Sequence, residues 1–177
     1  MGIIPITRRD ITSMLPEDSI GAELGVFEGD FSQELVTSNK FKKLWLVDVF
    51  QGRASNFGKV YYDASVLENI VTNRFKEVEE VEVVKSFSTE FLKDMPENVF
   101  DFIYIDTTHE YHYTVLELSE GLRCMKHGGL LCGHDYDNYR FPGVVKAVNE
   151  FCDRYELSLQ VTYESELPSF IIKIIKP

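Results

Sequence analysis

The chain of 177 residues carries a formal net charge of −11, and 44% of its residues are hydrophobic. This length and hydrophobic content predict one folded domain over residues 1–177 rather than a disordered chain. Such an acidic surface repels phosphate backbones, so we expect no nucleic acid among the partners. The first residues, Met1–Pro5, show no long apolar run typical of a signal peptide, and we expect no later stretch to span a membrane. The three cysteines match no metal or redox spacing. We therefore predict a soluble cytoplasmic protein that does not contact membranes.

A short helix and a strand are predicted at the start of the chain. Within the leading segment, residues 1–19, the stretch Thr7-Arg8-Arg9-Asp10 resembles a capping box that opens a helix. Apolar residues at helical spacing follow until Pro16 stops the run. The stretch Ile20–Leu24 is apolar apart from one acid and predicts the first strand of a sheet.

A glycine-containing turn follows this first strand. Glu23, Gly25 and Gly29 form the pattern Glu-x-Gly-x-x-x-Gly, with Phe27 between the glycines, and Asp30 is expected to cap the next helix. Glycines at a strand-to-helix turn let the backbone approach a ligand closely. The pattern is not the dinucleotide-binding Gly-x-Gly-x-x-Gly, which argues against a nicotinamide-dependent enzyme. A turn with an acid and no phosphate-binding residues suits a ligand with hydroxyls and a positive charge.

Alternating strands and helices are predicted in the middle of the chain. The three strands expected there are Leu44–Val49, Val81–Lys85 and Phe100–Asp106. The polar, aromatic stretch Gln51–Asp63 has no clean period and is expected to be a long loop over the ligand side. Ser65 can open the helix after this loop, and Ser88 is expected to cap a short helical turn that reaches Leu92.

The C-terminal part continues this alternation and then ends in two strands with no helix between them. A helix over Tyr113–Met125 is expected to bury Val115, Leu118 and Leu122 and to end at Gly128-Gly129. The later elements expected are a strand at Leu130–Gly133, a helix from Pro142, and strands at Leu159–Tyr163 and Phe170–Ile174. This order predicts an α/β fold with a doubly wound, mostly parallel sheet and an antiparallel edge.

Ligands of doubly wound sheets lie outside the carboxyl ends of the strands. The polar residues that end or interrupt apolar strands here are Glu23, Asp48, Asp106, His134 and Asp135. Asp48 lies about twenty residues after the glycine turn, where an acid can accept both hydroxyls of a ribose; the alternative is a solvated acid that caps a loop. Glu23 lies inside a strand, where an unpaired carboxylate is costly, so we expect it to bond a ligand amine, nearby amides or a structural network.

Asp106, His134 and Asp135 end neighbouring strands and are expected to converge on one point. Two carboxylates and an imidazole with room for water suit an octahedral Mg²⁺ or Mn²⁺ ion. The same groups without a metal could act as general base and orienting acid on a substrate hydroxyl, and a third alternative is a network that only shapes loops. His109 follows the fourth strand and has the position of a base or a substrate contact.

With these residues in place, the sequence resembles the class I S-adenosylmethionine-dependent methyltransferases, and within them the bacterial methyltransferase family 24 group. The resemblance covers roughly Ile20 to Cys152. The stretches that carry it are Glu23–Gly29, Leu46–Asp48, Phe100–Asp106 with His109 and Tyr111, Gly128-Gly129, Gly133–Tyr136, Pro142–Val144 and Ala147-Val148.

The resemblance implies a Rossmann-like sheet of seven strands with helices on both faces, whose last strand is antiparallel. It implies S-adenosylmethionine as cofactor, with Asp48 on the ribose, Ser86-Phe87 around the adenine and Asp106 near the transferred methyl group. The cofactor-binding set it implies is Glu23, Gly25, Phe27, Gly29, Asp48, Val49, Ser86, Phe87 and Asp106. Relatives that methylate sugar hydroxyls use a divalent metal held by acids at positions like Asp106 and Asp135.

The main hypothesis is therefore an S-adenosylmethionine-dependent O-methyltransferase that acts on a small hydroxylated molecule, such as a sugar or a secondary metabolite. Asp106, His109 and His134 are its candidate catalytic residues, and the metal ligands would be Asp106, His134 and Asp135. Acceptor recognition must use Gln51–Asp63, Thr107–Tyr113 and Asp135–Pro142, or a second subunit of a homo-oligomer. The alternative is a cofactor-binding protein without transferase activity that acts as a partner in a complex.

Overall fold

The fold is seen in a computed structural model that describes residues 6–51, 64–164 and 166–176. Its strands are β1 (Ser19–Leu24), β2 (Phe41–Asp48), β3 (Val81–Lys85), β4 (Phe100–Ile105), β5 (Met125–Gly133), β6 (Leu159–Val161) and β7 (Phe170–Lys173). Its helices are the 3₁₀ helix η1 (Arg8–Met14), α1 (Asp30–Thr37), α2 (Ala64–Phe75), α3 (Ser88–Asp94), α4 (Tyr111–Cys124) and α5 (Pro142–Tyr155). The predicted loop Gln51–Asp63 lies, apart from Gln51, outside the described residues.

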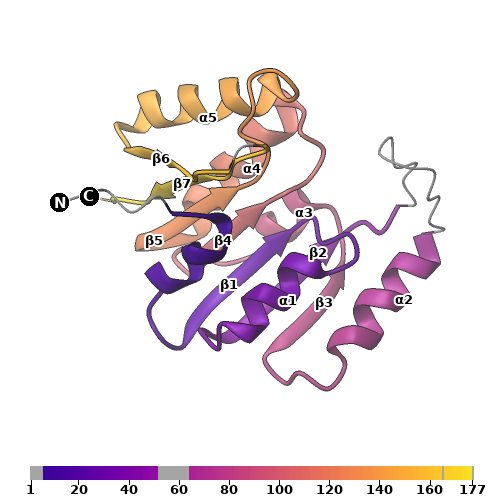
Figure 1. The fold of residues 1–177 in the computed structure, drawn as a ribbon. Coiled ribbons are helices and arrows are strands. Elements are labelled where there is room, and N and C mark those ends of the chain that lie inside the picture. Colours follow the sequence, from indigo (N-terminus) through magenta and orange to yellow (C-terminus); the bar gives the residue numbers. More distant parts are fainter. Residues whose placement is uncertain (1–5, 52–63, 165, 177) are drawn as a thin grey trace.

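The seven strands form one sheet in the order β3-β2-β1-β4-β5-β7-β6 (Figure 1). Strands β1 to β5 are parallel to their neighbours, whereas β7 runs antiparallel to both β5 and β6. Both the mostly parallel sheet and the predicted closing hairpin are therefore confirmed. The strand order reverses between β1 and β4, which in doubly wound sheets is where a ligand crevice forms.

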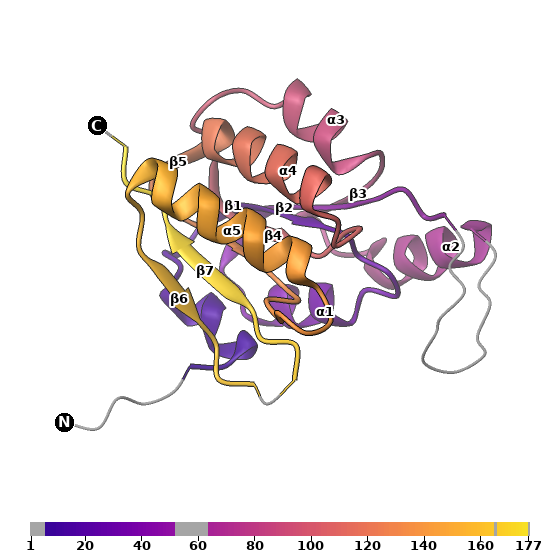
Figure 2. The same ribbon diagram turned by 90° about the horizontal axis from the view of Figure 1, so that it is seen from above.

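Helices cover both faces of the sheet. Viewed from above, α3, α4 and α5 lie on one side, and η1 and α1 lie on the other (Figure 2). Each side has its own buried cluster of apolar side chains, and α2 packs in the same cluster as η1 and α1. No helix in the described ranges has the length and hydrophobicity needed to cross a membrane.

The strand pairing at the reversal point brings three polar residues to one edge of the sheet. Glu23 on β1 lies opposite Leu46 on β2 and Tyr104 on β4. The backbone N–H of Asp106 donates to the carbonyl of Leu24 at 2.7 Å, and that of His134 donates to the carbonyl of Ile105 at 2.9 Å. The ends of β1, β4 and β5 are thus hydrogen-bonded side by side, which brings Asp106 and His134 together.

The helix after β4 differs from its prediction. It spans Tyr111–Cys124, and β5 begins at Met125, so Gly128-Gly129 lies inside a strand and does not end the helix. The buried face of α4 consists of Thr114, Glu117, Leu118, Gly121 and Cys124. Val115 is 36% exposed, because the true buried face is rotated by about one residue from the predicted stripe. A charged residue, Glu117, therefore lies where the prediction placed only apolar side chains.

Two predicted helix caps were also wrong. Gly29, with a φ of 83°, is the residue before α1, so Asp30 belongs to the first turn of that helix. Phe87 takes the equivalent place before α3, and Ser88 is the first residue of that helix. In both helices the expected capping residue lies one position inside, where its side chain is free to interact with groups other than its own helix.

Candidate functional site

A cavity of about 490 Å³ opens beside the carboxyl ends of β1, β2 and β4. The residues that line it are Arg8, Glu23, Gly25, Val26, Phe27, Glu28, Asp30, Phe31, Val47, Asp48, Val49, Gln51, Leu67, Ser86, Phe87, Ser88, Asp106, Thr107 and Thr108. This volume lies in the range of small-molecule and cofactor sites. The cavity lies at the point of strand reversal, as expected for the ligand site of a doubly wound sheet.

Gly25 begins the turn between β1 and α1 and brings that turn against the end of β4. Its φ is 90°, in the left-handed region that favours glycine. A Cβ atom placed on Gly25 would lie 1.9 Å from the carbonyl oxygen of Asp106. Glycine is therefore required at this position both for the backbone angle and for the close approach of the two strand ends.

Glu23 is buried, with an exposed fraction of 1%. The hydroxyl of Ser32, in α1, donates a 2.5 Å hydrogen bond to an oxygen of the Glu23 carboxyl group. Burial raises the pKa of Glu23 to about 8, against the smaller lowering effect of the Ser32 hydrogen bond. This carboxyl therefore holds a proton at neutral pH, and a cationic ligand in the cavity would favour its ionised form.

Asp48 ends β2 and holds the glycine turn in place. One of its carboxylate oxygens accepts hydrogen bonds from the backbone N–H groups of Val26 (2.8 Å) and Phe27 (3.0 Å), and the other accepts from Phe50 (2.7 Å). A carboxylate has about four acceptor positions, so capacity remains for a ligand hydroxyl. The structure thus gives Asp48 a structural role in addition to the predicted ribose contact.

A cluster of acids and histidines adjoins the cavity at Asp106. The Nε2 atom of His109 lies 3.2 Å from Asp106 Oδ1 and also contacts the Asp135 carboxylate. Burial lowers the pKa of His109, but the hydrogen bonds to Asp106 and Asp135 outweigh it and raise the pKa to about 9. His109 is therefore an imidazolium at neutral pH and acts as a donor between two carboxylates rather than as a base.

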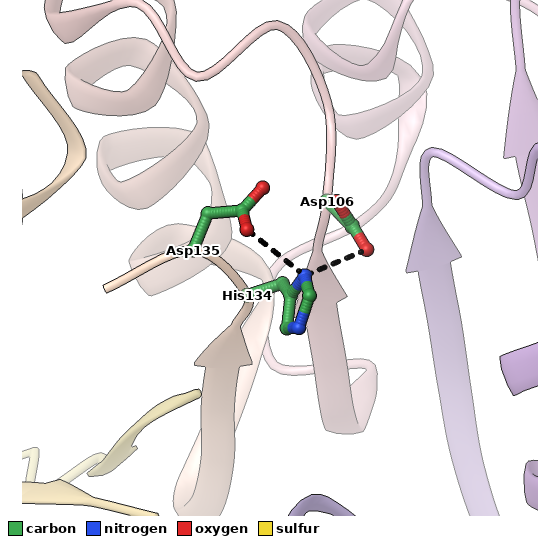
Figure 3. A group of neighbouring side chains, drawn as sticks. All are labelled: Asp106, His134 and Asp135. Atoms are coloured by element: carbon green, nitrogen blue, oxygen red, sulfur yellow. Dashed lines mark ion pairs between the residues drawn. The ribbon is translucent and has the colours of Figure 1, made fainter. Parts of the chain in front are cut away.

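His134 contacts the other oxygen of each of these two carboxylates. Its Nδ1 atom is 3.5 Å from Asp106 Oδ2 and 3.2 Å from Asp135 Oδ1 (Figure 3). Burial lowers the pKa of His134, and the nearby acids only partly offset this effect. The two histidines thus differ in charge, and His134 is the one that can accept a proton at neutral pH.

Asp106 itself is held ionised. Burial raises its pKa, but the hydrogen bond from His109 and the neighbouring cationic groups, Arg8 among them, outweigh burial and bring the pKa below its usual value. Asp106 also lines the cavity, whereas His109, His134 and Asp135 do not. His109 and His134 instead line a much smaller adjoining pocket. Asp106 is therefore the one member of the cluster that lines the larger cavity.

The donor set fits the predicted metal in part. One ligand atom from each of Asp106, His134 and Asp135 can be chosen so that all three lie within 4.8 Å of one another. Asp135 Oδ1 is buried and accepts no hydrogen bond from a described group, although His134 Nδ1 lies 3.2 Å from it, so it has capacity to bind a cation. However, His109 already contacts both carboxylates, so its imidazolium would have to move if a metal ion bound between them.

The predicted cofactor residues converge with one exception. Among the residues of that set, Glu23, Gly25, Phe27, Asp48, Val49, Ser86, Phe87 and Asp106 line the cavity. Gly29 does not, because it precedes α1 and faces Phe75, whose ring would lie 2.9 Å from a Cβ atom there. The predicted residues at the ends of β1, β2 and β4 are thus brought to one cavity, whereas His134 and Asp135 do not line it.

Sequence reasoning missed two residues of the site. Arg8, from η1, lines the cavity and lies 3.4 Å from Asp106. Glu117, from α4, is 1% exposed and accepts hydrogen bonds from Ser88 (2.5 Å) and Thr107 (2.8 and 3.0 Å), which both line the cavity. Glu117 could have been found, because it lies at helical spacing from Thr114 and Gly121, two small residues of the same buried face. Nothing in the sequence pointed to Arg8.

The geometry agrees with comparisons to known proteins. A family model described as a methyltransferase domain matches residues 22–136, more than half of the chain. A search of curated proteins gives no match. Among solved structures, SMU.1697c of Streptococcus mutans, in complex with SAH, has a TM-score of 0.68 and 13% identity over 97% of this chain and 100% of its own.

Two further structures share the fold. The O-methyltransferase NovP has a TM-score of 0.66 and 17% identity, over 95% of this chain and 76% of NovP. The spermidine synthase of Thermotoga maritima has a TM-score of 0.66 and 16% identity over 94% of this chain, which spans only 57% of that enzyme. At these identities the likeness concerns the fold alone, and the family rests on the model match. The chain belongs to the class I S-adenosylmethionine-dependent methyltransferases, in the family 24 group.

Proposed function

We propose that this protein transfers the methyl group of S-adenosylmethionine to a hydroxyl oxygen of a small molecule. The observation that carries the proposal is the position of Asp106, which lines the cofactor-sized cavity and contacts the histidine cluster behind it. The acceptor oxygen would attack the methyl carbon, the sulfur–carbon bond would break, and the hydroxyl proton would leave to a protein base. The net charge of −11 argues for a small acceptor rather than a nucleic acid.

Each member of the cluster has a role in this proposal. Asp106, ionised and facing the cavity, accepts a hydrogen bond from the acceptor hydroxyl and orients it for in-line attack. His134, uncharged and 3.5 Å from Asp106, takes up through Asp106 the proton that the hydroxyl loses. His109 remains charged and fixes the two carboxylates, which makes it a positioning residue rather than the base.

A divalent cation is the alternative to this acid–base chemistry. Asp106, His134 and Asp135 would hold Mg²⁺ or Mn²⁺, and the ion would lower the proton cost of the acceptor hydroxyl by acting as a Lewis acid. The Asp135 Oδ1 atom, which accepts no hydrogen bond from a described group, favours this alternative, and the His109 contact to both carboxylates disfavours it.

Calorimetry and a transfer assay would test the proposal. Wild-type protein should bind S-adenosylhomocysteine and should methylate at least one member of a panel of sugars and phenols with labelled S-adenosylmethionine. Asp106→Asn and His134→Gln should each reduce kcat by about a hundredfold or more. Asp94→Asn, an exposed change in α3, should leave kcat unchanged. Loss of turnover in EDTA that Mg²⁺ restores would favour the metal, and full turnover in EDTA would favour His134 as the base.

Two outcomes would contradict the proposal in different ways. If wild-type protein bound neither S-adenosylmethionine nor S-adenosylhomocysteine, the cofactor assignment would be wrong. If it bound both but transferred no methyl group to any acceptor, the chain would be a cofactor-binding protein without transferase activity.

A further inference from the structure

Arg8 is the one cation among the described residues that line the cavity. Its guanidinium stacks on the rings of Phe31 and Tyr104, with Cζ 3.8 Å and 4.9 Å from their centroids. Its side chain is 24% exposed, so it is largely withdrawn from water but reaches the cavity. Stacking fixes the plane of a guanidinium, so its N–H donors point along a defined edge.

The donors of Arg8 are poorly satisfied by the protein. Nη2 lies 3.4 Å from Asp106 Oδ2, which is long for a charge-assisted hydrogen bond. Nε is buried, and no group in the described part of the chain accepts a hydrogen bond from it. A buried donor without an acceptor is costly, so a ligand that brings an acceptor to this edge would remove that cost on binding.

Contacts with the other end of the chain hold Arg8 in this position. Its backbone N–H donates a 2.5 Å hydrogen bond to Glu164 Oε1, in the connection between β6 and β7. The neighbouring Tyr163 donates its N–H to the carbonyl of Ile6 at 2.8 Å. These contacts leave the Arg8 side chain free for the cavity. Arg8 and Glu164 both lie outside residues 22–136, the part that matches the family model.

The charges of the cavity determine which ligand group Arg8 can receive. The acids that line the cavity are Glu23, Glu28, Asp30, Asp48 and Asp106. They favour the ammonium and sulfonium groups of S-adenosylmethionine but repel its carboxylate. A planar guanidinium can bind a carboxylate through two parallel N–H donors, and Nε with Nη2 forms such a pair.

We infer that Arg8 binds the methionine carboxylate of the cofactor and so completes the cofactor site from outside the matched domain. The inference rests on the proposed use of S-adenosylmethionine. It also assigns the leading segment a function, because η1 delivers the anion-binding group that the glycine turn, β2 and β4 lack.

The test compares two ligands that differ only in the carboxylate. S-Adenosylhomocysteine carries it, and the decarboxylated analogue keeps the amine and the thioether without it. Arg8→Gln should weaken the binding of S-adenosylhomocysteine about tenfold to a hundredfold, as measured by calorimetry. The same variant should bind the decarboxylated analogue at least as tightly as wild type, because the analogue is a cation and Arg8 repels it. Arg8→Lys should show a smaller loss, since it keeps the charge and loses the paired donors.

Arg9→Gln is the matched control, because Arg9 is exposed and pairs with Glu34 on the surface. It should leave both affinities unchanged. The inference would be overturned if both Arg8→Gln and Arg8→Lys lost affinity equally for the two ligands. It would also be overturned if both variants bound S-adenosylhomocysteine as tightly as wild type. An Arg8→Gln variant whose only change was a higher KM for an anionic acceptor would also overturn it. Failure of wild type to bind either ligand would instead overturn the proposed function, so the two failures are distinguishable.

Discussion

The hydroxyl of Ser32 donates a 2.5 Å hydrogen bond to Glu23, and both side chains are buried. Ser32 lies in the first turn of α1 and Glu23 near the end of β1, so this bond joins the two elements that flank the glycine turn. One hydroxyl does not replace the hydration that a buried carboxylate loses. The pair therefore leaves Glu23 poised to ionise when a cation enters the cavity.

Glu23→Gln should change how stability depends on pH. The pKa of Glu23 is about 8 in the folded chain and near 4.5 when unfolded, so the folded chain binds more protons between these values. The contribution of this proton to the stability of the folded chain is fully present below the unfolded pKa. It is lost as the pH rises towards 8, by up to about 1.4 kcal/mol per pH unit. Glutamine keeps an acceptor for Ser32 and does not titrate. Urea unfolding at pH 5, 6.5 and 8 should show the variant gaining stability relative to wild type as pH rises.

Glu77→Gln is the control for this prediction, because Glu77 is exposed in the turn after α2. It removes one negative charge from the surface and should leave the pH dependence of wild type unchanged. A difference between Glu23→Gln and wild type that stayed constant from pH 5 to pH 8 would contradict the buried, protonated state of Glu23.

Glu117→Ala should weaken both the fold and the cofactor site. The Glu117 carboxyl group is the acceptor that Ser88 and Thr107 share, and both of these residues line the cavity. Removing a buried acceptor of this kind costs on the order of 1–3 kcal/mol. We expect that loss in the free energy of unfolding by urea. We also expect weaker S-adenosylhomocysteine binding, because α3 and the loop after β4 lose their common anchor.

Glu120→Ala separates this role from a general effect of losing an acid in α4. Glu120 lies on the same helix and pairs with Arg123, and such partly exposed pairs contribute about 1 kcal/mol or less. Its change should leave cofactor affinity intact. Equal affinities of the Glu117 and Glu120 variants for S-adenosylhomocysteine would show that Glu117 does not position the cavity.

The fold was largely predictable because buried parallel strands are nearly continuous apolar runs, and an acid or histidine near the carboxyl end of such a run is conspicuous. Glu23, Asp48, Asp106 and His134 were found in this way, and strand pairing then places them at one edge. The buried faces of the helices were harder to predict. In α4 the apolar stripe was assigned one residue off, which hid Glu117 among presumed surface residues.

The remaining site residues depend on tertiary contacts that no local pattern encodes. Arg8 reaches the cavity because Glu164, distant in sequence, holds its backbone. The charge of His109 depends on where two carboxylates from different loops lie relative to its ring. Spacing along the chain identified His109 as a candidate base, and only the geometry shows that both acids contact the same nitrogen.

His109→Asn should lower turnover without removing cofactor binding. His109 has a φ of 60°, and asparagine is among the residues that tolerate the left-handed region, so the backbone can be retained. The variant loses the donor shared by Asp106 and Asp135. We expect kcat to fall about tenfold or more, with S-adenosylhomocysteine affinity nearly unchanged because His109 does not line the cavity.

The pH profile provides a second readout for His109. The hydrogen bond from His109 lowers the pKa of Asp106, so its loss should raise that pKa. If the reaction needs ionised Asp106, the acidic limb of the kcat profile should move to higher pH in His109→Asn. His112→Asn is the control, because His112 is exposed in the first turn of α4. An acidic limb at the wild-type position in both variants would contradict the link between His109 and Asp106.

Gly25→Ala and Gly128→Ala should separate backbone strain from steric exclusion. Both glycines have similar left-handed φ values, 90° and 84°. A Cβ atom on Gly128 meets nothing within 4 Å, so Gly128→Ala should cost only the strain, about 1–2 kcal/mol. A Cβ atom on Gly25 would lie 1.9 Å from the carbonyl oxygen of Asp106, so the turn or the end of β4 must move.

Gly25→Ala should therefore lose more unfolding free energy than Gly128→Ala, by on the order of 1–3 kcal/mol. It should also weaken the binding of S-adenosylhomocysteine by at least about tenfold, because the movement displaces Asp106 and the cavity wall together. Gly128→Ala should bind the ligand as wild type does, since Gly128 lies in β5 away from the residues that line the cavity. Equal stabilities and affinities of the two variants would mean that the contact between the turn and β4 is dispensable, and that only the backbone angle matters at Gly25.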